Sequence, residues 1–482
     1  MACFVNALCA LDRAEPVQPQ TAGEGREQRQ SVAVASRYRR REPEKSLLHE
    51  TVRQHLKTFL AGLEQDGTGL PRFVVAEFER YLRCGILANG FVRVRCTTCG
   101  DDLLVAFSCK SRGLCPSCTT RRMQGTATHL VDRVLPHVPM RQWVLSLPRW
   151  ARFLLARDPK LITRTLQLAL RCIFARQRRR ARREGVRGAQ AGAVTFVQRF
   201  GSALNLNVHF HCVVPDGVWT RDTGGAARFV PLPGLADDDV AQVLHRVERR
   251  VRALLKPRLE ALREDARPPD ALAASQSESV HLHANDRQGL AHLCGYGARP
   301  PLTQERLSAL PDGKLAYRMK RRLGDGREVL ILEPRELLRR LATLVPPPRA
   351  HLVRYHGVFG PASKWRTEIV PVPPPACPVA PPTPRAPASK RGSESKPPRP
   401  LDSRVPWSAL LLRVFREDVL ACPCGGRRKV IAFIDERPAI DRILGHLGLP
   451  ITGPPTAPAR LAALDGDPRW QDDVPGLQQA LR

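Results

Sequence analysis

The sequence is poor in acidic side chains, in aromatic side chains and in long apolar runs. Its 482 residues include 46 Asp and Glu against 77 Lys and Arg, so the formal net charge is +31. Such a balance argues against a small-metabolite enzyme of ordinary charge and fits a polyanionic partner, nucleic acid before an acidic membrane surface. No apolar run reaches the length of about 18 residues that a membrane-spanning helix needs, so we expect no membrane partner.

The N-terminal stretch Met1–Pro16 is too short for a signal peptide and lacks a basic flank before its apolar part. We therefore expect a cytoplasmic, reducing location. The 14 cysteines are then predicted to be metal ligands or core thiols rather than disulfides.

Composition and periodicity divide the chain into five predicted segments. Of residues 371–400, 12 are Pro, which is typical of a semi-rigid solvated linker. The segments are a disordered basic tail (1–45), a helical and zinc-binding DNA-binding domain (46–135), a domain of mixed helices and strands (136–370), a Pro-rich linker (371–405) and a small C-terminal domain (406–482).

Two cysteine pairs, Cys96/Cys99 and Cys115/Cys118, have the C-x2-C spacing of a structural zinc site. Two such knuckles complete a tetrahedron of thiolates around one Zn²⁺, so we predict that these four residues share one ion. Cys84 and Cys109 lie upstream and between the pairs, and either is a candidate for a second site. Cys422-Pro-Cys424 has one residue fewer than a zinc knuckle, so the spacing does not predict zinc there.

Basic residues near the knuckles and on a predicted helix are candidate DNA contacts. The helix has an apolar stripe that includes Leu166 and Leu170, and six of the eight residues 176–183 are Arg. Contacts with several phosphates would make DNA binding depend steeply on salt, whereas solvated surface charge is the alternative. The candidates are Lys110, Arg112, Arg121, Arg122, Arg178, Arg179 and Arg180.

Residues 204–213 alternate with a period of two, which predicts a strand. Val208 and Phe210 fall on one face, and His209 and His211 fall on the other. Two imidazoles that point the same way from one strand form a platform for a divalent ion. The pair His281/His283 is a weaker candidate, because no long alternating strand surrounds it.

A divalent ion beside a DNA-binding surface suggests phosphodiester cleavage, either by water or by attack of a side chain. The chain has only 5 tyrosines. Tyr296 lies at the end of a predicted helix over residues 286–296, and we favour it as a nucleophile over Tyr355. Each of the two is alternatively a packed aromatic residue.

In this order, the motifs resemble those of bacterial rolling-circle HUH transposases of the insertion-sequence ninety-one type. The resemblance covers about residues 47–370. It rests on the cysteine segment Cys96–Cys118, the block Gln198–His211 with its His-hydrophobic-His signature, Tyr296 followed by Arg299-Pro300-Pro301, and the block Arg354–Val358.

The resemblance implies an α+β fold, with an HUH-type antiparallel sheet and helices preceded by a small zinc-ribbon domain. It implies a metal-dependent enzyme that cleaves and rejoins single-stranded DNA at transposon ends and in target DNA. His209 and His211 would hold Mg²⁺ or Mn²⁺, Tyr296 would form a 5′-phosphotyrosine, and the zinc segment would bind the element's DNA.

Two features of the catalytic segments leave this resemblance incomplete. Members of this type often carry two tyrosines four residues apart, but His292 occupies the position four before Tyr296. A third metal ligand is also needed, and Gln198 and Asn207 are the candidates. The alternatives are a non-catalytic zinc-ribbon DNA-binding protein, which is a decayed transposase, and a plasmid replication initiator or relaxase.

Overall fold

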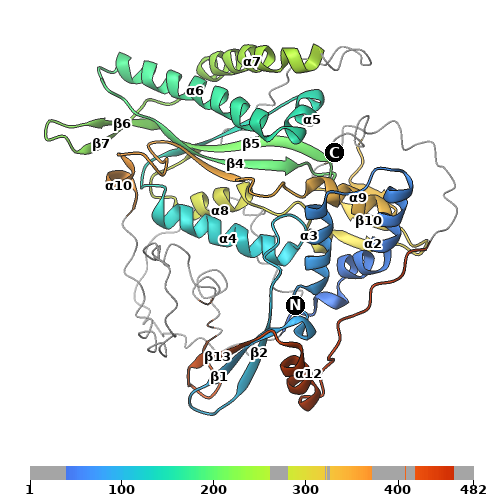
Figure 1. The fold of residues 1–482 in the computed structure, drawn as a ribbon. Helices are drawn as coiled ribbons and strands as arrows, with labels where there is room; N and C mark the ends of the chain where they lie inside the picture. The colour runs from blue at the N-terminus through green and yellow to red at the C-terminus, as the bar shows by residue number, and fades with distance from the viewer. Residues whose placement is uncertain are drawn as a thin grey trace, which may run out of the picture.

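The structure is a computed structural model, shown in Figure 1. It describes residues 40–260, 281–320, 322, 326–371, 408, 418 and 420–460. Most of the predicted disordered tail and of the predicted Pro-rich linker lies outside these described residues. Within them, no helix combines the length and the apolar character needed to cross a membrane.

A five-stranded antiparallel sheet forms the centre of the fold (Figure 1). In spatial order its strands are β12 (Val353–Gly357), β4 (Gly192–Phe200), β5 (Leu206–Pro215), β3 (Met140–Ser146) and β8 (His281–Leu282). Every neighbouring pair is antiparallel. The predicted α+β class with an antiparallel sheet is therefore confirmed.

The period-two pattern of β5 places its side chains in two separate cores. Val208 and Phe210 are buried on one face, together with Leu166 and Leu170 of the predicted apolar stripe. Val213 is buried on the opposite face, in the core below the sheet. Because alternate residues of a strand point to opposite faces, the histidines next to Val208 and Phe210 lie on the second face.

Helices cover both faces of this sheet (Figure 1). One face carries α5 (Arg149–Arg157), α6 (Pro159–Arg183) and α7 (Asp237–Glu260), and the other carries α4 (Pro116–Arg133) and α8 (Arg287–Gly297). Asp158 caps α6 by accepting a hydrogen bond from the N–H of Lys160 at 2.8 Å. The hairpin of β6 (Gly217–Arg221) and β7 (Ala227–Pro231) extends from this layer.

A second unit combines N-terminal helices with elements from the middle of the chain. Its elements are a 3-10 turn η2 (Pro43–Lys45), α2 (Leu47–Gln65), α3 (Arg72–Arg83), a 3-10 turn η4 (Gln304–Arg306), β9 (Leu307–Ala309), β10 (Leu315–Arg318), β11 (Val329–Leu332) and α9 (Pro334–Leu344). Their side chains share one core that runs from Leu48 to Val345. The core thus crosses the predicted domain boundary after residue 135. A short helix, α10 (Arg366–Ile369), follows β12.

The zinc ribbon is closed by the C-terminal part of the chain. Its sheet has the order β13 (Arg428–Ile434), β1 (Phe91–Cys96) and β2 (Asp102–Ala106). The 3-10 turn η3 (Leu87–Asn89) and α12 (Arg437–His446) supply its small apolar core. In Figure 1, the red β13 lies beside the blue β1. Residues 420–460 therefore complete the N-terminal ribbon, which corrects the prediction of a separate C-terminal domain.

Candidate functional site

The two predicted ligand histidines lie side by side on β5. His209 and His211 are buried, with 8% and 5% of their surface exposed, and their ring centroids are 5.0 Å apart. Burial is the largest cause that lowers the pKa of His209 to about 4 and the pKa of His211 to about 3. The positive charge of Arg299 also lowers both pKa values. Both imidazoles are therefore neutral at neutral pH, as metal binding requires.

Hydrogen bonds orient both rings. Nδ1 of His209 lies 2.8 Å from the carbonyl oxygen of Asn207, and since a carbonyl only accepts, Nδ1 carries the proton. This leaves the lone pair of Nε2 free for a metal. Nε2 of Gln142 lies 2.5 Å from Nδ1 of His211. Nε2 of His211 is buried and has no hydrogen-bond partner among the described residues.

Tyr296 approaches this pair from α8. Its ring centroid is 5.5 Å from that of His211, in an edge-to-face arrangement of 80°. Gly297 permits the approach, because a Cβ there would lie 2.5 Å from the ring of Phe196 on β4. Asp286 caps the start of the helix by accepting a hydrogen bond from Gly289 N–H at 2.7 Å. The helix therefore ends with its tyrosine beside the histidine strand.

Gln198 joins the helix to the histidines. It lies opposite His209 in the pairing of β4 with β5. Its Nε2 donates hydrogen bonds to the carbonyl oxygens of Tyr296 at 2.8 Å and Gly297 at 2.9 Å, which fixes the orientation of the amide. Its Oε1 is buried and without a partner among the described residues. Two neutral imidazoles and one amide oxygen are a donor set that suits Mn²⁺, Mg²⁺ or Zn²⁺.

Two cations flank the tyrosine. The guanidinium carbon of Arg299 lies 4.2 Å from the ring centroid of Tyr296 and 5.4 Å from that of Phe200. Nζ of Lys320 lies 5.2 Å from the Tyr296 ring. The site therefore combines neutral metal-ligating groups, one phenol and positive charge, which suits an anionic substrate.

The competing candidates lie elsewhere. Tyr355 packs in the core below the sheet under the guanidinium of Arg366, and burial raises its pKa. No ring contact among the described residues joins it to His209 or His211. His281 pairs with Asp216 at 3.1 Å, at the end of β3 away from His209.

Eight cysteines form two clusters of four. The two C-x2-C pairs that were predicted to share one ion lie in different clusters. Cys115 and Cys118 lie with Cys84 and Cys109. The Sγ atoms of neighbouring members are 3.5–3.7 Å apart. A tetrahedron with Zn–S bonds of about 2.3 Å has edges of about 3.8 Å, so this geometry fits one Zn²⁺.

The other predicted pair belongs to the second cluster. Cys96 and Cys99 lie with Cys422 and Cys424, at Sγ–Sγ distances of 3.6 Å and 3.7 Å. The prediction that the two C-x2-C pairs share one ion is therefore wrong. The reason is that β1 and β2 separate the pairs, while the pairing of β13 with β1 brings the C-terminal cysteines to the same end of the sheet.

Comparison with known proteins finds two matching family models. Residues 51–147 match the family model described as "Transposase zinc-binding domain", and residues 192–366 match the model described as "Putative transposase". The chain is therefore similar to transposases that carry a zinc-binding domain. The first match contains the whole first cysteine cluster, and the second contains Gln198, His209, His211 and Tyr296. The predicted family resemblance and a structural role for zinc are thereby supported together.

One relative of this chain is a protein of Sinorhizobium fredii (strain NBRC 101917 / NGR234) named "Putative transposase y4qJ". It is 26% identical over 306 residues, which cover 58% of this chain and 72% of the relative. No solved structure matches the chain.

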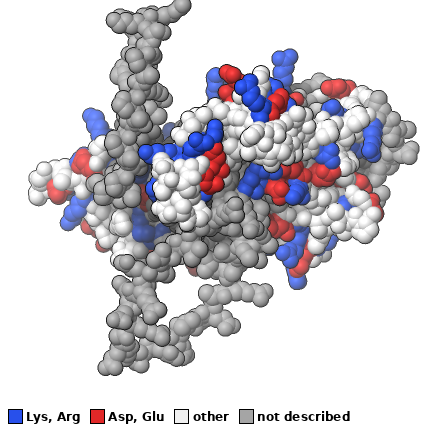
Figure 2. All heavy atoms as spheres, turned by 90° about the horizontal axis from the view of Figure 1, so that it is seen from below, with Lys and Arg blue, Asp and Glu red and all other residues white. Residues whose placement is uncertain are grey.

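The basic residues near the first cluster differ in their exposure and in their hydrogen bonds. Lys110 and Arg121 are exposed. Nη2 of Arg122, also exposed, donates to the carbonyl oxygen of Lys110 at 3.0 Å. Nη2 of Arg112 donates to the carbonyl oxygen of Ala350 at 2.7 Å, so this residue braces the fold. Figure 2 shows basic and acidic side chains intermixed on the face seen from below.

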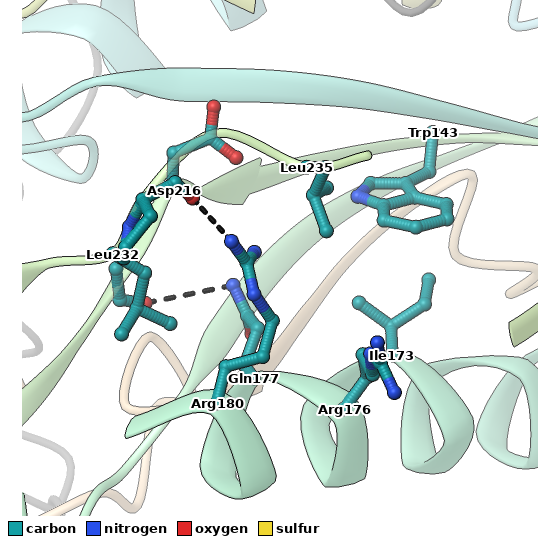
Figure 3. Close-up of a pocket in the computed structure, with 10 residues that line it drawn as sticks. Trp143, Ile173, Arg176, Gln177, Arg180, Asp216, Leu232 and Leu235 are labelled. Carbon is teal, nitrogen blue, oxygen red and sulfur yellow. Dashed lines mark hydrogen bonds between the residues drawn. The ribbon is translucent and has the colours of Figure 1, made fainter. Parts of the chain in front are cut away.

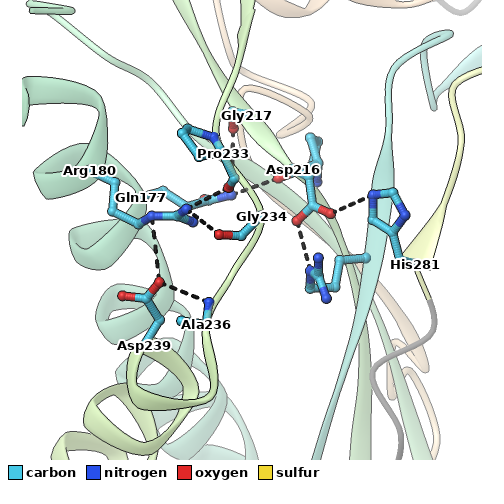
Figure 4. A network of polar contacts seen from close by, with 11 residues as sticks. Gln177, Arg180, Asp216, Gly217, Pro233, Gly234, Ala236, Asp239 and His281 are labelled. Atoms are coloured by element: carbon cyan, nitrogen blue, oxygen red, sulfur yellow. Dashed lines mark hydrogen bonds and ion pairs between the residues drawn. The ribbon is translucent and has the colours of Figure 1, made fainter. Parts of the chain in front are cut away.

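The Arg-rich end of α6 is partly bound within the fold (Figure 4). Arg180 pairs with Asp239 at 3.7 Å and donates to the carbonyl oxygen of Gly234 at 2.7 Å. These contacts give Arg180 a structural role, and its DNA contact stays a prediction. Arg178 is half-buried and Arg179 is exposed, and their DNA contacts stay predictions.

A small pocket lies beside the same helix, between Trp143, Ile173 and Arg176 (Figure 3). Trp143 packs against the core on the sheet face opposite the histidines. Gln177 lines the pocket and donates to the carbonyl oxygen of Pro215 at 2.6 Å. The pocket is thus part of the packing of α6 and is separate from the candidate catalytic site.

Sequence reasoning missed several residues of these sites. Arg299 follows Tyr296 by three residues in the sequence, and this position is a local signal for its place beside the tyrosine ring. Lys320 reaches the Tyr296 ring from a distant segment, and Gln142 reaches His211 from a neighbouring strand, so spacing gives no signal for either. Arg41 donates to Sγ of Cys84 at 3.6 Å, which places a positive charge beside the first cluster.

Proposed function

We propose that the chain cleaves and rejoins single-stranded DNA through Tyr296, with a divalent ion held by His209, His211 and Gln198. The observation that carries this proposal is the contact of the Tyr296 ring with the His211 ring, whose centroids are 5.5 Å apart. Two atoms that can ligate a metal, Nε2 of His211 and Oε1 of Gln198, are buried without hydrogen-bond partners among the described residues. The bound ion would polarise a phosphate oxygen and offset charge in the transition state. Mg²⁺ and Mn²⁺ are the proposed ions.

The chain's own groups have distinct tasks in this reaction. The Tyr296 oxygen attacks the scissile phosphorus, and the bond from phosphorus to the 3′ oxygen breaks. The products are a 5′-phosphotyrosine and a free 3′-hydroxyl, and the ester keeps the bond energy for rejoining. Arg299 and Lys320 attract the phosphate and stabilise the attacking phenolate, because both place positive charge beside the ring.

The orientation of Gln142 is also defined by this proposal. In the structure, Nε2 of Gln142 faces Nδ1 of His211, an arrangement that leaves the ring proton on Nε2 of His211. Metal binding through that Nε2 requires the other tautomer, so the proposal requires the amide of Gln142 to be turned over, with its oxygen accepting the proton of Nδ1. Gln142 would therefore hold His211 in the ligating tautomer, as the carbonyl oxygen of Asn207 does for His209.

One chain supplies one nucleophile to this site. His292 lies on α8 one turn before Tyr296, is exposed, and replaces the second tyrosine that many members carry. Cleavage and strand transfer would then use the same phenol in turn, or two chains would each supply one.

A cleavage assay tests the proposal. Labelled single-stranded DNA that carries the element's own ends is incubated with Mg²⁺ or Mn²⁺, and covalent protein–DNA adducts are resolved on a denaturing gel. We expect an adduct with the wild type and with Tyr355→Phe, and a loss of at least about 10³-fold with Tyr296→Phe or His209→Ala. Tyr355→Phe is the matched control, since it removes a hydroxyl from a tyrosine that packs in the core.

Other results would contradict the proposal. An adduct that survives in Tyr296→Phe and is lost in Tyr355→Phe would transfer the nucleophile to Tyr355. DNA binding without an adduct in any variant would instead favour the decayed, purely DNA-binding alternative.

A further inference from the structure

The second cysteine cluster joins two distant segments of the chain, and only one of them lies within a matched family model. Cys96 and Cys99 lie inside the matched zinc-binding domain, whereas Cys422 and Cys424 lie beyond both matched segments. We propose that these four thiolates bind a second Zn²⁺ and that this ion fastens the C-terminal segment to the DNA-binding ribbon.

The sulfur positions fit one tetrahedral ion. All four Sγ atoms lie within 4.8 Å of one another, and the cross-chain distances are 3.6 Å and 3.7 Å. These values are close to the edge of about 3.8 Å expected for four Zn–S bonds of about 2.3 Å. A disulfide would need a separation of about 2.05 Å, so the four groups are free thiols.

The backbone around each pair is that of a metal knuckle. Thr98 N–H points to Sγ of Cys96 at 3.5 Å, and Gly426 N–H points to Sγ of Cys424 at 3.4 Å. Such donors stabilise thiolates, which are the metal-binding form. In each knuckle the second cysteine is followed by a glycine with positive φ, +74° at Gly100 and +82° at Gly425. The shorter Cys422–Cys424 spacing is therefore compatible with the same turn.

The two knuckles approach each other closely. A Cβ on Gly426 would lie 2.4 Å from Oγ1 of Thr98 and 2.9 Å from Sγ of Cys96. Only a glycine allows this approach without displacing the opposite knuckle. The register of β13 on β1, which pairs Arg428 with Cys96, keeps the two turns at the same end of the sheet.

The donor chemistry selects the metal. Four thiolates with no oxygen or nitrogen donor suit Zn²⁺ in a closed, structural site and exclude Mg²⁺ or Ca²⁺. Arg428 also ion-pairs with Asp101 at 3.1 Å, next to the cluster. The site is distinct from the proposed catalytic ion, because its ligands belong to the ribbon sheet and not to the central sheet.

Zinc counting on the full chain tests this proposal independently of catalysis. The purified protein is dialysed against metal-free buffer, and zinc per chain is measured by plasma mass spectrometry. We expect two zinc ions in the chain with all its cysteines and one in the double variant Cys422→Ser/Cys424→Ser, with His209→Asn/His211→Asn introduced into every protein so that the histidine site binds no zinc. The matched control Cys172→Ala/Cys212→Ala, which changes two buried cysteines outside both clusters, should retain two.

Other counts would overturn the proposal. One ion in both the chain with all its cysteines and the Cys422→Ser/Cys424→Ser variant would show that the second cluster is not a zinc site. Two ions in both would place the second zinc on other ligands. If the variant does not fold, Co²⁺ substitution of the wild type decides. Thiolate-to-cobalt absorption from eight sulfurs per chain supports the second site, and absorption from four excludes it.

Discussion

The two cysteine clusters offer the same four ligands in opposite settings. The first draws its cysteines from residues 84–118, and three of the four are buried in the core that also holds α2 and α9. The second spans 323 residues between Cys99 and Cys422, and Cys99 and Cys424 are exposed. The comparison indicates that one cluster is part of a hydrophobic core, whereas the other is a surface fastening between distant segments.

The largest expected difference is in stability. Cys115 is fully buried, so Cys115→Ser would lose the first zinc and leave unpaired polar groups inside the core. We expect a loss of at least about 5 kcal/mol of unfolding free energy, measured by chemical denaturation followed by circular dichroism. Cys424→Ser, at an exposed position, should cost clearly less. Equal losses in the two variants would contradict the comparison.

The stability of the folded chain should depend on pH through the buried His209 and His211. The folded-state pKa values of His209 and His211, about 4 and about 3, lie below the unfolded value of about 6.5. The stability from keeping them neutral is present above pH 6.5 and is lost as the pH falls towards 4. At pH 5 we expect a cost of about 2 kcal/mol for each histidine, without added divalent ions.

The control for this pH dependence is the variant His209→Asn/His211→Asn. Its stability should fall less than that of the wild type between pH 7 and pH 5, when both are followed by thermal unfolding. Parallel curves for the two proteins would mean that the histidines are not buried as neutral groups. The difference between the proteins cancels any change at the zinc sites, which both share.

The order of zinc release is the next prediction. A chelator reaches the exposed Cys99 and Cys424 directly, but it reaches the first cluster only after the core opens. We expect two phases of zinc release with rates that differ by at least about tenfold, followed with a colorimetric zinc indicator. Only the slow phase should remain in Cys422→Ser/Cys424→Ser. A single phase in the wild type would argue against unequal protection.

The smallest effect should come from Gly426→Ala. The added methyl group would crowd Thr98 and Cys96, and crowding of this kind costs about 1–3 kcal/mol. We expect zinc affinity at the second site to fall about tenfold in competition titrations. Gly445→Ala is the control, since no atom lies within 4 Å of the added carbon. Unchanged affinity in Gly426→Ala would indicate that the knuckles do not need their close approach.

Local patterns predict the strand and the helix that carry the histidines and Tyr296. Strand alternation placed His209 and His211 on one face, and the glycine and proline after Tyr296 marked the end of its helix. Both signals are local, and the family comparison supports the transposase to which they point. The function of each residue in this site stays a prediction that the cleavage assay tests.

Contacts between segments that are distant in the sequence could not be predicted from residue spacing. Spacing groups cysteines by proximity along the chain, whereas β13 reaches β1 after more than 300 residues. The Arg cluster of α6 was similarly ambiguous, because the acidic start of α7 that binds Arg180 lies on another element. Predicting such pairs requires the register between elements, and periodicity within one element does not contain that information.

The pairing of β13 with β1 also sets a schedule for synthesis. At translation rates of about 5–20 residues per second, the ribosome reaches Cys422 roughly 16–65 seconds after it has passed Cys99. During that interval the nascent chain contains β1 and β2 without β13, and Cys96 and Cys99 lack the other two cysteines of their cluster. The first cluster completes within the early domain, so the DNA-binding unit matures in two steps. A ribosome that stalls after the central sheet would release a chain whose ribbon lacks β13.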